Sequence, residues 1–217
     1  MQAAPQYQPP QDPIEIIYQD NALLVVNKPA GLLSVPGKTE DQSDCLEARL
    51  RAQFRDTYLV HRLDMDTSGL IVFARKKRVQ RHLNAQFENR TVKKTYVALV
   101  SGEVLEDAGR INLAMRTDWP NRPLQMIADD GKPAITDWKV LERGAGFSRV
   151  ELRPETGRTH QLRLHMKAIG HPILGDRFYA DAVACAASDR LCLHAKKLSF
   201  EHTDTKLVVS FESSAAF

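Results

Sequence analysis

The segment HRLDMDTSGL at residues 61–70 runs directly into the apolar residues IVFA at 71–74. The run from Leu70 to Ala74 is short, rich in bulky side chains and bounded by Gly69 and Arg75, which predicts a buried strand. A charged loop that leads straight into a core strand can hold a reactive group rigidly. The alternative is that Asp64 and Asp66 only cap turns, as Asp often does.

The overall composition is that of an ordinary globular protein. The chain has 217 residues, 43% of them hydrophobic and 26% charged, enough for one large domain or two small ones. Its three cysteines form no C-x-x-C pair and no disulfide framework, which suits a reducing compartment. No apolar run approaches the roughly 18 residues of a membrane helix, and no secretory signal is visible. We therefore expect a cytoplasmic protein with no membrane partner.

Charge is distributed unevenly along the chain. Residues 1–47 carry seven acids and two bases, a net charge of −5, whereas residues 75–94 carry eight bases and one acid, a net charge of +7. Such asymmetry predicts a face that binds a polyanion such as RNA. The alternative is a solvated helix surface.

Residues 1–13 are rich in Pro and Gln and predict a flexible N-terminal tail or an extended arm. Residues 14–217 contain no internal linker or repeat, so we expect one domain there. Its predicted strands and helices follow one another through short turns, which favours an α+β fold with a mainly antiparallel or mixed central sheet flanked by helices and loops. The strands are expected at residues 14–18, 22–27, 70–74, 91–100, 110–115, 134–142, 147–153, 191–200 and 207–212.

Three helices are predicted, and polar residues mark their beginnings. Ser43 is the expected N-cap of the first helix, and residues 77–89 form the second. Thr159 is the expected N-cap of the third, which ends near Gly170. Lys28, at the end of the second predicted strand, is expected either to meet a phosphate or to lie in water.

Two further segments carry candidate binding residues. Asp118-Trp119-Pro120-Asn121-Arg122-Pro123 predicts an exposed loop in which Trp119 and Arg122 offer a stacking ring beside a cation. Such a pair suits unstacked RNA bases, although Trp119 could instead plug the loop onto the core. The segment from Arg158 to His165 is dense in polar groups. The spacing of His160 and His165, with no H-E-x-x-H, argues against a metal site.

The motif around Asp64 resembles the signature of the RluA-type pseudouridine synthases. The phrase Val-Asn-Lys-Pro-Ala-Gly-Leu, the Lys-Thr-Tyr-Val-Ala segment and the region around His160 are also similar to motifs of this family. The 118–123 loop resembles the family's dual-specificity branch, which modifies a hairpin loop of 23S rRNA and the tRNA anticodon stem-loop. The resemblance covers nearly the whole chain and leaves no room for the additional small RNA-binding domain that many relatives carry.

The resemblance also implies roles for individual residues. It implies that Asp64 is the catalytic aspartate, that Arg163 pairs with it, with Arg158 in reserve, and that Tyr96 lies against the target base and could handle the C5 proton. A guanidinium near Asp64 would keep the carboxylate charged in a desolvated pocket. Asp66 would be a turn residue, because neighbours two apart in an extended loop point to opposite sides. Further substrate contacts are expected from Arg62, Arg158, His160, Trp119, Arg122 and Leu193.

The implied reaction turns uridine into pseudouridine, with no cofactor and no metal, on RNA stem-loops and by a monomer. The target uridine must be turned out of its loop, and Arg62 could fill the vacated space. One rival reading is a glycosidase or nucleoside-cleaving enzyme, with Asp64 and Asp66 as its two carboxylates. The other is a non-catalytic RNA-binding module, which would need the basic and stacking residues but no desolvated Asp–Arg pair.

Overall fold

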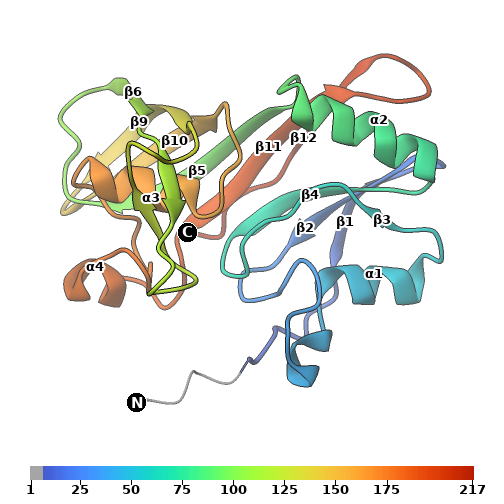
Figure 1. The fold of residues 1–217 in the computed structure, drawn as a ribbon, viewed down its shortest axis with the longest axis horizontal. Helices are drawn as coiled ribbons and strands as arrows, with labels where there is room; N and C mark the ends of the chain where they lie inside the picture. Colours follow the sequence, from blue (N-terminus) through green and yellow to red (C-terminus); the bar gives the residue numbers. More distant parts are fainter. Residues whose placement is uncertain (1–6) are drawn as a thin grey trace.

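The computed structural model describes residues 7–217 and contains one large mixed sheet at its centre (Figure 1). Its strands lie in the order β1-β2-β4-β11-β5-β10-β9-β6, with β3 added on β4 and β12 on β11. The bounds are β1 Glu15–Gln19, β2 Leu23–Lys28, β3 Tyr58–Leu59, β4 Ser68–Ala74, β5 Lys93–Ser101, β6 Ala108–Asn112, β9 Ile135–Gly144, β10 Phe147–Pro154, β11 Leu193–Glu201 and β12 Val208–Glu212.

These strands pair antiparallel except for β4 and β11, which are parallel. The predicted α+β fold with a mixed, mainly antiparallel sheet is therefore confirmed. Two short strands, β7 (Met115–Thr117) and β8 (Gln125–Ile127), form a separate hairpin. The predicted strand over 110–115 is wrong as one element, because the chain ends β6 at Asn112 and starts β7 at Met115.

The helices flank two halves of the sheet. Figure 1 shows α1 (Leu46–Gln53) and α2 (Lys77–Glu88) with the half formed by β1, β2 and β4, and α3 (Gln161–Ala168) and α4 (Ala182–Ala186) with the half formed by β6, β9 and β10. The long strands β5 and β11 join the halves. Side chains from the two halves can therefore contact one another where the halves adjoin.

Two predicted helix caps are wrong. Ser43 ends a short 3-10 helix, Glu40–Ser43, and Cys45 caps α1 by accepting a hydrogen bond from the amide of Ala48. Residue His160, in the left-handed backbone region with φ 55°, replaces Thr159 as the cap of α3. In both cases the chain turns into the helix one or two residues later than the polar pattern suggested, as helix boundaries often do.

Strand β4 is buried along its whole length, as its apolar run predicts. Leu70 and Val72 pack into one core cluster, and Ile71 and Phe73 into another. This is the alternation expected of a strand covered on both faces. Gly69 has φ +112°, and a Cβ there would lie 2.4 Å from the carbonyl oxygen of Ala195. The parallel pairing of β4 with β11 therefore requires glycine at the end of the motif loop.

The N-terminal prediction falls partly outside the described residues, which begin at Tyr7. Residues 7–13 have no regular secondary structure, yet they contact the domain. The Tyr7 hydroxyl donates to the carbonyl of Asp44 at 2.9 Å, and Arg49 donates to the carbonyl of Pro10 at 2.8 Å. Among the described residues, no helix is long and apolar enough to cross a membrane.

Candidate active site

The backbone on both sides of Asp64 is fixed by hydrogen bonds from the end of β2 and from the segment that follows it. The Ser34 hydroxyl donates to the carbonyl of Leu63 at 2.7 Å and accepts from its amide at 3.2 Å. The Lys28 ammonium donates to the carbonyl of Met65 at 2.8 Å, and the amide of Gly31 donates to the same oxygen at 2.9 Å. The loop is thus pinned one residue before and one residue after Asp64, which limits how far that carboxylate can move.

Lys28 is a correction to both sequence interpretations, because it meets neither a phosphate nor water. Its side chain is fully buried and donates to the carbonyls of Pro29, Leu32 and Met65 at 2.7–2.9 Å. Burial lowers the pKa of Lys28 to about 7, and the nearby charges of Asp66 and Asp64 act in the opposite direction. Three carbonyl acceptors match the three protons of an ammonium, so this lysine is a structural clamp for the motif loop.

Asp64 lines a small cavity of about 100 Å³ where the two halves of the sheet adjoin, here called the catalytic cavity after the role that the sequence predicts for Asp64. Its side chain is 29% exposed, and no hydrogen bond to it is present among residues 7–217. The cavity has room for a group the size of one base, so the remainder of an RNA must bind outside it. Seven of the nine predicted site residues line it: Arg62, Asp64, Tyr96, Arg158, His160, Arg163 and Leu193.

Arg163 lies beside Asp64 but grips a different carboxylate. Its Nη1 is 3.7 Å from Asp64 Oδ2, whereas Nε and Nη2 donate to Asp176 at 2.8 and 2.6 Å. Burial lowers the pKa of Arg163, but the hydrogen bonds with Asp176 and its charge, with that of Asp64, outweigh burial and raise it. Arg163 therefore forms its two hydrogen bonds with Asp176 and not with Asp64, which faces the remaining guanidinium nitrogen.

Asp176 is itself fully buried, and its carboxylate accepts several hydrogen bonds. Besides Arg163, the amides of Phe178 and Tyr179 donate to its Oδ1 at 2.9 and 3.2 Å. The guanidinium carbon of Arg163 also lies 4.9 Å from the ring centroid of Phe178. A buried ion pair persists only when hydrogen bonds satisfy both partners, and this one meets that condition.

His160 and Tyr96 complete the cavity wall. His160 Nε2 is 4.0 Å from Asp64 Oδ2, and its Nδ1 is 2.8 Å from the Tyr179 hydroxyl. Burial lowers the pKa of His160, so the ring is neutral near pH 7. Burial, and secondarily the charge of Asp64, raise the pKa of Tyr96, which keeps its hydroxyl protonated. The cavity thus combines one carboxylate, one fixed cation, a neutral imidazole and an aromatic ring.

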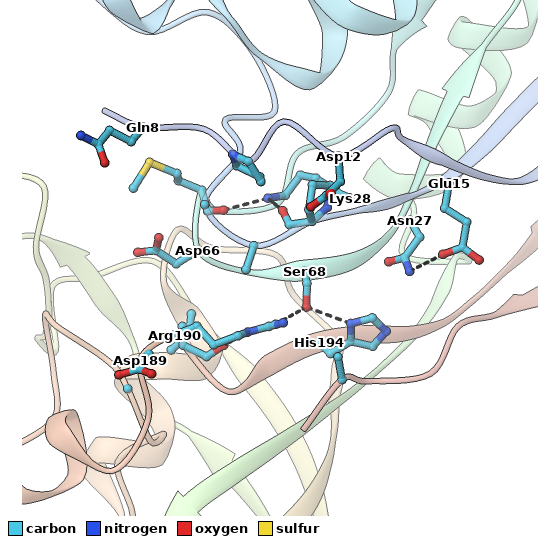
Figure 2. A pocket seen from close by; sticks show the side chains of 18 of the residues that line it. Gln8, Asp12, Glu15, Asn27, Lys28, Asp66, Ser68, Asp189, Arg190 and His194 are labelled. Atoms are coloured by element: carbon cyan, nitrogen blue, oxygen red, sulfur yellow. Dashed lines mark hydrogen bonds between the residues drawn. The ribbon is translucent and has the colours of Figure 1, made fainter. Parts of the chain in front are cut away.

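Asp66 lies outside this cavity, as the alternation of the loop predicts. It lines a second cavity of about 830 Å³, here called the lateral cavity, together with Lys28, Ser68, Arg190 and His194 (Figure 2). Arg190 donates to Ser68 Oγ at 2.6 Å, and Ser68 shares a 2.9 Å hydrogen bond with His194 Nδ1. The two carboxylates that a glycosidase would need therefore face different cavities.

Trp119 and Arg122 are the two predicted site residues that do not line the catalytic cavity. They occupy the exposed loop between β7 and β8, where the Arg122 guanidinium lies 3.6 Å from the Trp119 ring centroid. Trp119 is 63% exposed, so it does not plug the loop onto the core. The ring and the cation instead form a surface platform.

Sequence reasoning missed four residues that hold the site in place: Lys28, in its true role, and Ser34, Asp176 and Tyr179. Asp176 follows the polar segment around His160 in the sequence, and its carboxyl type was the available signal for a partner of Arg163. No local pattern marked Ser34 or Tyr179. Within residues 7–217 no group of three or more His, Cys, Asp or Glu side chains is arranged to hold a metal ion.

Comparisons with known proteins show which family this chain is similar to. The sequence model of a family described as RNA pseudouridylate synthase matches residues 22–168, which include Asp64, Tyr96 and Arg163. Proteins called dual-specificity RNA pseudouridine synthase RluA are similar along almost their whole length. The one from Pasteurella multocida is 50% identical and the one from Escherichia coli K12 is 48% identical, each over 214 residues that cover 97% of this chain and 98% of the relative.

Solved structures show the same relationship. Human RNA Pseudouridylate Synthase Domain Containing 1 superposes with a TM-score of 0.80 at 32% sequence identity, covering 100% of this chain and 87% of that chain. The chain therefore belongs to the RNA pseudouridylate synthase family. It is a pseudouridine synthase, an isomerase that acts on RNA.

Proposed function

We propose that this enzyme isomerises uridines in two kinds of RNA hairpin, a loop of 23S rRNA and the tRNA anticodon stem-loop. Support comes from relatives of 48–50% identity whose names carry the words dual-specificity. The exposed Trp119–Arg122 platform adds a stacking surface suited to unstacked loop bases. The observation that carries the catalytic part is the Asp64 carboxylate, free of hydrogen bonds within the described residues and 3.7 Å from Arg163 in a base-sized cavity.

The reaction rearranges bonds without adding or removing atoms. The bond between ribose C1′ and base N1 breaks, the base turns, C5 bonds to C1′, and the hydrogen on C5 is replaced by one on N1. Because nothing is oxidised or transferred, we propose that no cofactor or metal takes part. Asp64 supplies the charged oxygen, by attack on the ribose, attack on the base or removal of a ribose proton. The Arg163 guanidinium, with Nη1 3.7 Å from Asp64 Oδ2, offsets part of the cost of holding a negative charge in the enclosed cavity.

The other residues of the cavity are proposed to hold the nucleotide. The ring of Tyr96 provides a surface on which the target base stacks, and its hydroxyl can relay the C5 proton. Leu193 adds an apolar contact, while Arg158 and His160 offer hydrogen-bond donors. Arg62 is exposed at the mouth and enters the space that the extruded uridine leaves. Extrusion costs a few kcal/mol, which these contacts offset.

We further propose that the protein works as a monomer in the cytoplasm. Cys45, Cys185 and Cys192 are free thiols, and Cys45 and Cys192 are buried, as suits a reducing compartment. Sedimentation of the purified protein in the presence and absence of RNA tests the monomer.

The experiment that tests the function uses RNA tritiated at uridine C5. We expect the purified protein to release tritium to water from both an rRNA hairpin and a tRNA anticodon stem-loop, with pseudouridine mapped at one loop position in each. The RNA mass should change only by the exchanged hydrogen. Release of free uracil would instead support nucleoside cleavage, and activity on only one of the two RNAs would refute the dual specificity.

A further inference from the structure

A third cavity, which we call the basic groove, adjoins the catalytic one. It measures about 710 Å³ and lies where the beginning of β5, which is still paired with β11, separates from the end of β10. Lys94 and Pro154 line both the groove and the catalytic cavity. A strand whose nucleotide occupies the catalytic cavity can therefore continue directly into the groove.

The acids of the groove are neutralised within the protein. Asp137 and Glu155 both pair with Arg110, at 3.2 and 2.5 Å, while Glu151 pairs with Arg153 at 2.5 Å and Glu212 with Lys197 at 2.7 Å. Four cations that line the groove form no ion pair among the described residues: Arg90, Lys93, Lys94 and Lys196. The groove therefore presents uncompensated positive charge despite its mixed composition.

This charge has a cost in the free protein. Burial, and next the repulsion of Arg90, lower the pKa of Lys94 to about 8. A negative group placed between these side chains would remove the repulsion. Phosphates spaced along an RNA backbone provide several such groups at once, and each Lys or Arg contact also releases a counterion.

We propose that the basic groove binds the phosphate backbone of the stem next to the target loop. This inference rests on the proposed function, since it takes the substrate to be a stem-loop. The catalytic cavity holds only a base-sized group, so the flanking chain must leave it, and the contiguous groove with unpaired cations is the exit that suits a polyanion. Phosphate contacts of this kind position an RNA without reading its sequence.

The test reverses charge inside and outside the groove. Lys93→Glu and Lys196→Glu change two groove residues, and Lys38→Glu makes the same change in the exposed segment between β2 and α1. We expect each groove variant to raise the Kd for an anticodon stem-loop about tenfold, and Lys38→Glu to bind with a Kd close to that of the wild type. The salt slope of log Kd should fall in magnitude by about one for each groove variant.

Binding and chemistry then separate the two proposals. A single-stranded oligonucleotide with the loop sequence alone should lose less affinity in the groove variants than the stem-loop does, because only the stem-loop places the phosphates of a stem in the groove. Stem-loop affinities of Lys93→Glu and Lys196→Glu that match Lys38→Glu would overturn the groove inference, even with an active enzyme. Failure of the wild-type protein to form pseudouridine would instead overturn the proposed function, because Kd is measured without the reaction.

A different observation concerns Tyr179, whose buried hydroxyl has two partners. It accepts a hydrogen bond from the amide of Gln125 at 2.9 Å and lies 2.8 Å from His160 Nδ1. The amide can only donate, so the hydroxyl's own proton needs an acceptor. His160 Nδ1 is the acceptor within reach, and it must therefore carry no proton. In a neutral ring the proton then resides on Nε2, which lies 4.0 Å from Asp64 Oδ2.

We infer that Tyr179 is a positioning residue that fixes His160 in the Nε2–H tautomer and aims that N–H at the space beside Asp64. Gln125 begins β8, so the same hydroxyl also ties the hairpin that carries Trp119 and Arg122 to the catalytic cavity. The Tyr179 hydroxyl thus links the hairpin that would bind RNA to the orientation of His160.

The tautomer is measured directly by ¹⁵N NMR of the histidine side chains at pH 7. We expect the wild-type His160 signal to report a proton on Nε2, and Tyr179→Phe to give a mixture of tautomers with a lower kcat. Tyr18→Phe removes an exposed hydroxyl as the matched control and should leave the His160 signal unchanged. A wild-type proton on Nδ1, or a Tyr179→Phe signal identical to wild type, would refute the assignment.

Discussion

The catalytic cavity and the lateral cavity lie on the two sides of one loop, and they differ in how far their polar groups satisfy one another. In the lateral cavity Arg190, Ser68 and His194 form a connected set of hydrogen bonds (Figure 2). In the catalytic cavity the Asp64 carboxylate has Arg163 at 3.7 Å and His160 at 4.0 Å, but no hydrogen bond within the described residues. A group that is surrounded by donors yet not occupied by them keeps its capacity to react.

The largest effect should come from the two aspartates of the loop. Asp64→Asn removes the charged oxygen and is expected to lower the single-turnover rate of pseudouridine formation at least about 10⁴-fold. Asp66→Asn makes the same change in the lateral cavity and should leave the rate near wild type. Tritium release from C5-labelled RNA measures both. Comparable losses in the two variants would show that the cavities do not differ as proposed.

The next largest effect should come from the buried Arg163–Asp176 ion pair at the catalytic cavity. Asp176→Asn removes the charged partner of Arg163 and leaves a buried cation, so the free energy of unfolding should fall by about 3–5 kcal/mol. Asp189→Asn, at an exposed position of the lateral cavity, is the matched control and should change stability by less than about 0.5 kcal/mol. Urea unfolding compares the two. An unfolding free energy unchanged by Asp176→Asn would contradict the assigned ion pair.

A third prediction concerns Lys28, whose three hydrogen bonds hold the motif loop between the two cavities. Lys28→Met keeps the length of the side chain but leaves three carbonyls without their donor, and we expect a loss of about 2–4 kcal/mol in unfolding free energy. Lys38→Met, at an exposed site between β2 and α1, should have little effect. Equal stability of the two variants would return Lys28 to the role of a solvated or phosphate-binding lysine.

The smallest effect concerns pH and the edge of the catalytic cavity. Lys94 has a pKa of about 8, so it is charged below that pH and loses its charge as the pH rises past it. Affinity for the stem-loop should therefore weaken between pH 7 and 9, by about fivefold if one charged contact of about 1 kcal/mol is lost. Lys94→Arg keeps its charge over this range and should flatten the profile. A steep profile that persists in Lys94→Arg would assign the titration to another group.

Most of the fold followed from local patterns. The apolar run at 70–74 and the periodic pattern at 77–89 predicted β4 and α2 within two residues of their ends, because burial on both faces or on one stripe leaves a direct trace in the sequence. The short strands β3, β7 and β8 and the helix α4 left no such trace. The strands have only two or three residues and α4 has five, which is too short for a periodic pattern to show.

The sequence by itself determined the chemistry that is available: a motif loop with Asp64, an aromatic ring on a strand, and a polar segment with His160 and Arg163. Only the tertiary structure decided which of these groups meet. It paired Arg163 with Asp176 through two hydrogen bonds and joined the buried Lys28 to the carbonyl of Met65, 37 positions away. It also placed Asp64 and Asp66 in different cavities. Residue type fixes what a side chain can donate or accept, whereas the partner that receives it depends on packing between segments that no local pattern encodes.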